Sequence, residues 1–120
     1  MNNRPYEITE QFFKLLEQHF EDLLSGRVLQ MYHTKEFADI ICLHPNYFTQ
    51  LVTEQTGKSI CEWIELKTLQ EAQRLLTHTD KPIAQIAFDL TYNDASNFTK
   101  FFKKFAGVTP SQYRAQQVKP

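Results

Sequence analysis

The sequence has few of the residues that would indicate a sheet, a secreted scaffold or a membrane span. Only 3 of its 120 residues are glycine and only 2 are cysteine. No strict apolar/polar alternation runs far, so a sheet-rich fold is not expected. No run approaches about 18 apolar residues, and the N-terminus lacks an apolar stretch, so neither a transmembrane helix nor a signal peptide is expected. These absences predict a cytoplasmic chain whose Cys42 and Cys61 are reduced, small core residues.

The chain also lacks a net positive charge, since its formal charge is −1. Most non-specific affinity for nucleic acid comes from Lys and Arg, so the total charge alone does not favour such a partner. The charge is unevenly distributed, however. Residues 1–33 carry three basic and five acidic side chains, a net of −2, whereas residues 95–120 carry five basic and no acidic ones. This asymmetry predicts that the C-terminal region faces a polyanion.

Residues for catalysis or metal binding are scattered. The histidines, His19, His33, His44 and His78, fall on different predicted helices. Cys42 and His44 have no companion pair at metal-site spacing. The sequence has neither a glycine-rich phosphate loop nor a Gly-x-Ser-x-Gly motif. We therefore expect no enzyme, no catalytic residue, no metal and no cofactor.

Apolar residues recur at three- and four-residue steps along most of the chain, which predicts an all-α fold of seven helices. Thr34 and Asn93 are predicted N-caps, Ser59 and Glu62 form a predicted capping box, and Pro82 starts a short helix. The expected helices cover residues 8–25, 35–42, 45–55, 60–78, 82–89, 94–105 and a short segment from 110.

One local pattern occurs twice. FTQLVTEQTGKSI at 48–60 and FTKFFKKFAGVTP at 98–110 both begin Phe-Thr and place Gly at the tenth position. Each stretch belongs to a pair of short helices, which is the layout of a helix-turn-helix, although helical hairpins recur in many all-α domains. The helix at 60–78 would span about 28 Å, close to the roughly 34 Å of one DNA turn. This length predicts two recognition helices in successive major grooves. The second helices are offset by fifty residues but Ala38 and Ala87 by forty-nine, which predicts one residue added at the second turn.

The second helix of each pair offers polar side chains opposite its apolar stripe. Asn and Gln can pair with adenine edges, Lys with guanine or phosphate, and Thr or Ala with a thymine methyl. The alternative interpretation is an ordinary solvated helix face. The candidate residues are Asn46, Thr49, Gln50 and Thr53 in the first helix, and Ala95, Ser96, Asn97, Thr99, Lys100, Lys103 and Lys104 in the second.

Residues 34 to 114 resemble the C-terminal DNA-binding domain of AraC/XylS-family transcription regulators. The resemblance is carried by IAQIA at 83–87, FTKFFKKF at 98–105, GVTP at 107–110, and Tyr113-Arg114. It implies two helix-turn-helix units bridged by a long helix, and double-stranded promoter DNA as the partner. The base-reading positions of the family map onto Asn46, Thr49 and Gln50, and onto Ala95, Ser96, Asn97 and Lys100; Thr99 maps onto a phosphate-facing position.

The resemblance divides the chain into an N-terminal linker or interaction helix, 1–33, and a DNA-binding domain, 34–117. It implies two further candidate partners, RNA polymerase and an N-terminal sensor or dimerisation domain. It also implies that the chain is either an excised fragment or a minimal regulator, and that it acts at the bacterial nucleoid. The alternative is a helical protein-interaction module with weak or no DNA binding. In that hypothesis the segment 6–33, with Phe12, Phe13 and Phe20, contacts another protein.

Three positions depart from the family pattern. Cys42 and Thr91 stand where the turn usually has Gly, and a β-branched residue at positive φ costs on the order of 1 kcal/mol. We expect Thr91 either to tolerate that strain or to avoid it through an altered turn. Gln50 and Thr53 replace the usual basic residues of the first recognition helix. Pro82 replaces a common Ser or Thr cap, and we expect it to leave the helix start intact.

Overall fold

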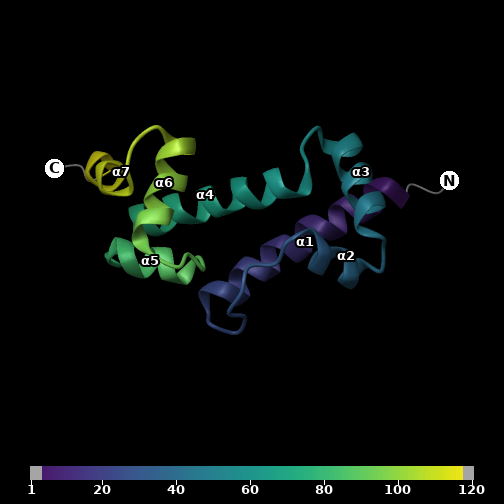
Figure 1. Ribbon diagram of the computed structural model, residues 1–120, viewed down its shortest axis with the longest axis horizontal. Helices are drawn as coiled ribbons and strands as arrows, with labels where there is room; N and C mark the ends of the chain where they lie inside the picture. The colour runs from purple at the N-terminus through teal and green to yellow at the C-terminus, as the bar shows by residue number, and fades with distance from the viewer. Residues whose placement is uncertain (1–3, 118–120) are drawn as a thin grey trace. The chain divides into compact units, whose positions relative to one another are not determined.

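The computed structural model describes residues 4–117, which form seven α-helices and no strand (Figure 1). This confirms the predicted all-α fold, and most helix ends lie within two residues of their predicted positions. The first helix begins four residues earlier than expected, because Pro5 suits a first turn and the hydroxyl of Thr9 donates to the Pro5 carbonyl at 2.9 Å. The helices are α1 (Arg4–Leu24), α2 (Thr34–Ile41), α3 (Pro45–Thr56), α4 (Ile60–His78), α5 (Ile83–Asp89), α6 (Ala95–Ala106) and α7 (Pro110–Gln117).

Helix starts are set largely by local capping. The predicted box at α4 is confirmed, since the Ser59 amide donates to Glu62 at 2.8 Å and the Glu62 amide to Ser59 Oγ at 3.1 Å. The predicted caps Thr34 and Asn93 are each wrong by one residue. His33 precedes α2, because its amide donates to Glu36 Oε1 at 2.7 Å. Asp94 precedes α6, because its charged carboxylate is the stronger acceptor and receives the N3 amide.

The chain divides within α4 into two compact units, Met1–Glu65 and Leu66–Pro120. In the first unit, α1 packs against both α2 and α3. The ring of Phe12 is fully buried and meets Phe37 and Phe48 edge-on, with centroids 5.4 and 5.5 Å apart. Phe13, which the alternative hypothesis placed against another protein, packs on Trp63 with ring centroids 5.0 Å apart. The apolar side of α1 is therefore used inside this unit.

The second unit is built around α6. Phe98 and Phe102 are fully buried, and Phe102 meets Tyr113 of α7 edge-on at 5.4 Å. Phe105, expected on the apolar side, is 44% exposed. The guanidinium of Arg114 donates to three backbone carbonyls, those of Leu76 (3.1 Å), Thr79 (3.1 Å) and Lys81 (2.7 Å). Arg114 thus holds the end of α4 and the following turn to α7.

The two helix-turn-helix units share one turn geometry. Cys42 and Thr91 have φ of 65° and 72°, so both adopt the left-handed conformation expected at positions that usually hold Gly. They lie 49 positions apart, whereas Pro45 and Ala95, where the next helices begin, lie 50 apart, which confirms the added residue. In both turns the amide of the positive-φ residue donates to the carbonyl three residues earlier, and the next amide donates to the carbonyl five residues earlier. These hydrogen bonds are 2.9–3.2 Å long and join Cys42 to Asp39, Leu43 to Ala38, Thr91 to Phe88 and Tyr92 to Ala87.

The strain at Thr91 predicts a stabilising substitution. Thr91→Gly removes the Cβ clash of a β-branched residue at φ 72°, which outweighs the extra freedom of Gly in the unfolded chain. We expect the free energy of unfolding in urea to rise by about 1 kcal/mol. Thr77→Gly, inside α4, is the control and should lower stability. A lower stability of Thr91→Gly would contradict the strain at this turn.

Candidate nucleic-acid interface

Helix α3 is positioned by its two ends and its buried face. Pro45 occupies the first turn, and His44 Nδ1 accepts the Asn46 amide at 3.1 Å. The helix ends at Gly57, whose φ is 82°. Phe48, Leu51 and Val52 are buried. The predicted residues lie on the other face, where Asn46, Gln50 and Thr53 are exposed and Thr49 is half-buried.

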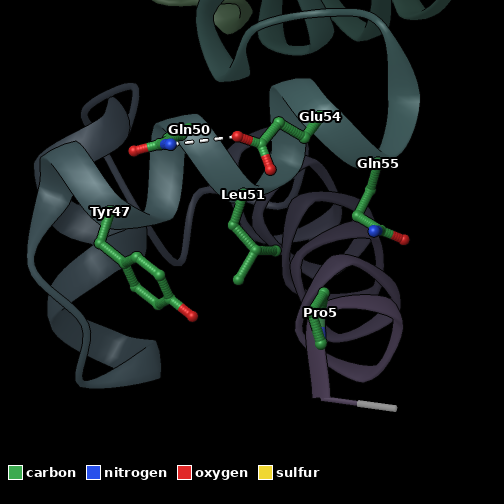
Figure 2. A pocket seen from close by; sticks show the side chains of 6 residues that line it. All are labelled: Pro5, Tyr47, Gln50, Leu51, Glu54 and Gln55. Atoms are coloured by element: carbon green, nitrogen blue, oxygen red, sulfur yellow. Dashed lines mark hydrogen bonds between the residues drawn. The ribbon is translucent and has the colours of Figure 1, made fainter.

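Two further residues share the exposed face of α3, and the sequence reasoning missed both. Tyr47 was expected on the apolar side but is 50% exposed. Glu54 lies one turn beyond Gln50 and accepts its side-chain Nε2 at 3.0 Å (Figure 2). The spacing 47, 50, 54 follows one helix face and could have identified them. The only charged side chain on α3 is therefore acidic.

A pocket of about 120 Å³ lies beside this face, where the first turn of α1 approaches α3. Figure 2 shows Leu51 at its centre, with Gln50 and Glu54 on the helix above. The Gln50–Glu54 pair therefore lies at the edge of a pocket that α3 forms with the first turn of α1. The pocket is lined by Pro5, Tyr47, Gln50, Leu51, Glu54 and Gln55.

Helix α6 presents a basic face. Asp94 Oδ1 accepts the Asn97 amide at 2.8 Å and caps the helix, and Gly107 with φ 82° ends it. With Phe98 and Phe102 buried, the predicted residues lie on the remaining surface. Within residues 4–117, none of its three lysines forms an ion pair with another side chain. Ser96, Asn97, Lys100, Lys103 and Lys104 are exposed, and Ala95 and Thr99 are half-buried.

The eleven predicted residues thus form two groups, one on α3 in the first unit and one on α6 in the second. The prediction of core cysteines is wrong, since Cys42 and Cys61 are both exposed free thiols. Cys42 is the positive-φ residue of the first turn, and Cys61 lies in the first turn of α4, 4.0 Å from the hydroxyl of Thr34. In the described part of the chain, no three His, Cys, Asp or Glu side chains are arranged to hold a metal ion. No helix of residues 4–117 is long and apolar enough to cross a membrane.

Two helix-turn-helix units with polar second helices define the class of this fold. The model of the family described as "Helix-turn-helix domain" matches residues 37–116, from the middle of α2 to near the end of α7. The chain belongs to the AraC-type helix-turn-helix family, as the sequence resemblance predicted.

Characterised relatives and solved structures agree with this assignment. The arabinose operon regulatory protein of Escherichia coli K12 is 35% identical over 78 residues, which cover 65% of this chain and 27% of that protein. The regulatory protein PocR of Salmonella typhimurium is 34% identical over 82 residues, covering 68% of this chain and 27% of that protein. The chain thus spans about a quarter of the length of these relatives.

The fold is also found in solved structures. The C-terminal domain of AraT, a response regulator from Geobacillus stearothermophilus, superimposes with a TM-score of 0.83 at 24% identity, over 98% of this chain and 92% of that one. The DNA-binding domain of AdpA, solved with a target DNA, has a TM-score of 0.73 at 19% identity, covering 88% of this chain and 90% of that one.

Proposed function

We propose that this chain is a sequence-specific DNA-binding transcription regulator whose helices α3 and α6 enter successive major grooves of promoter DNA. The exposed face of α6 carries the proposal. It combines three lysines with Ser96 and Asn97 opposite a buried aromatic stripe, as base and phosphate contacts require. Family membership and the AdpA domain solved with DNA support it.

The two helices would contribute unequally. Helix α6 would anchor the chain through Lys100, Lys103 and Lys104, because cations release counterions from phosphates. Helix α3 has no Lys or Arg, so its contribution would come from contacts to base edges through Asn46 and Gln50.

The wider proposal keeps residues 34–117 as the DNA-binding region, acting at the bacterial nucleoid in the cytoplasm. The further candidate partners of this chain are RNA polymerase and an N-terminal sensor or dimerisation domain, because the curated relatives are much longer than this chain. In the alternative hypothesis, a protein-interaction module, aromatic residues of α1 contact another protein. Phe12 and Phe20 are buried, and Phe13 packs on Trp63, so these rings are engaged within the first unit.

The anchoring role predicts the behaviour of Lys100→Ala. A cognate duplex is first selected from a random double-stranded pool, and binding is then measured by fluorescence anisotropy across a salt series. We expect affinity near 0.1 M salt to fall about fivefold, and the slope of log affinity against log salt to decrease by about one unit. Lys14→Ala on α1 is the control, because it removes the same charge from an exposed position outside α6. Unchanged affinity and slope in Lys100→Ala would exclude the anchoring role.

A further inference from the structure

We propose that Glu54 is a positioning and specificity-determining residue that holds the side-chain amide of Gln50 in one orientation. This inference rests on the proposed function, in which Gln50 contacts a base edge. Glu54 is the one charged side chain on α3, and it lies on the helix face that Gln50 shares.

The orientation follows from the chemistry of the pair. An ionised carboxylate has no hydrogen to donate, so only the amide nitrogen of Gln50 can face it. The contact in the structure is of this kind, with Nε2 donating to Glu54 Oε1 at 3.0 Å. The amide oxygen of Gln50 consequently points away from Glu54 (Figure 2). Without this partner the terminal amide could rotate by a half-turn and exchange its donor and acceptor.

A fixed amide discriminates between purines. One N–H of Gln50 is used by Glu54, which leaves a second N–H and the carbonyl oxygen. These match the N7 acceptor and N6 donor of adenine. Guanine presents two acceptors, N7 and O6, so the fixed oxygen would meet an acceptor. Glu54 therefore favours adenine over guanine at the position that Gln50 contacts.

The charge of Glu54 has a separate effect on affinity. A carboxylate on a helix without Lys or Arg is repelled by the phosphates of any DNA, whatever its sequence. This repulsion lowers the affinity for all sequences alike, so base discrimination is left to the orientation of Gln50. Removing the charge should raise affinity for unrelated DNA while it weakens base discrimination.

The test uses the whole chain, the duplex selected by the wild type, and single-base variants of that duplex. Gln50→Ala first identifies the base pair that Gln50 reads, as the position where discrimination is lost. At that pair, Glu54→Gln should reduce the preference for adenine over guanine about tenfold. Its affinity for an unrelated duplex should rise several-fold. Glu10→Gln, an equal charge change at an exposed site on α1, should change neither quantity.

A double-mutant cycle separates positioning from a general structural effect. In a Gln50→Ala background, Glu54→Gln should have no further effect on base discrimination, because the amide that it orients is absent. An unchanged adenine preference in Glu54→Gln alone would overturn the inference, as would an effect that persists without Gln50. Either result leaves the proposed function standing. Failure of the wild type to select any sequence from the pool would overturn the proposed function and this inference with it.

Discussion

Arg114→Ala is expected to lower the free energy of unfolding by about 3 kcal/mol. Its guanidinium donates to the carbonyls of Leu76, Thr79 and Lys81, where α4 ends and the chain turns toward α5. Hydrogen bonds from a charged donor are stronger than neutral ones, and their loss leaves three part-buried acceptors without this partner. The positive charge also complements the negative end of the α4 dipole.

This result can be measured by urea unfolding followed by far-ultraviolet circular dichroism. Arg114→Lys keeps the charge but presents a single ammonium in place of a planar fork, so it should recover about half of the loss. Arg74→Ala is the matched control on α4, because the side chain of Arg74 is 50% exposed and its partner Glu71 keeps a second ion pair, with Lys67 at 3.3 Å. It should change stability by less than about 1 kcal/mol. A loss of similar size in Arg74→Ala and Arg114→Ala would refute the special role of Arg114.

A second large effect is expected from acidification, through His19. Its ring is 3% exposed, stacks on Tyr32 at 4.1 Å, and accepts the Tyr32 amide at Nε2 over 2.9 Å. When Nε2 of a neutral imidazole accepts a hydrogen bond, the ring carries its proton on Nδ1. The Nδ1 atom of His19 is buried without a hydrogen-bond partner. Burial lowers the pKa of His19 from 6.5 to about 4; Asp22 and Glu36 raise this pKa by smaller amounts, and His33 lowers it further.

The sign of the pH effect follows from these two values. Between pH 6.5 and about pH 4 the unfolded chain binds a proton at residue 19 and the folded chain does not. Stability contributed by the neutral ring is therefore complete above pH 6.5 and decreases as the pH falls, by up to about 3 kcal/mol. Trp63, the single tryptophan, lies in the same unit and reports its unfolding by fluorescence.

The matched variant is His19→Gln, which can still accept the Tyr32 amide but does not titrate. Its stability should be lower at neutral pH, because the stacked ring is lost, and should depend less on pH between 6.5 and 4.5. All other ionisable side chains are the same in both proteins, so the difference isolates His19. Parallel pH profiles of the two proteins would refute the depressed pKa.

Local chemistry made much of the fold predictable. Helix ends are set by residues that act on neighbours at most a few positions away, and the predicted ends lie close to the observed ones. Such residues are Pro45, the glycines that end helices, and the capping boxes Ser59–Glu62 and Thr109–Gln112. The left-handed conformation of Thr91 was left open by the sequence, because a β-branched residue disfavours positive φ and only the family resemblance indicated the turn position. The two groups of candidate site residues lie on helix faces that hydrophobic periodicity identifies.

Other contacts and exposures depend on which helices pack against each other. Phe13 lies on Trp63, fifty positions away, and no periodicity of α1 could indicate that contact. Phe105 and Tyr47 stand at the edges of apolar stripes, where exposure depends on the reach of the neighbouring helix. The Gln50–Glu54 pair was within reach of sequence reasoning, because the two residues are four apart on one helix.

The sequence by itself determined the seven helices, the capping box at the start of α4, the repeated helix pair and the family. These features depend on interactions between near neighbours, whose geometry is set once the backbone becomes helical. Only the tertiary structure decided that α1 is packed into the first unit, that Cys42 and Cys61 are exposed, and that Arg114 joins α7 to the end of α4. Burial and long-range hydrogen bonds arise only when segments distant in the sequence pack together.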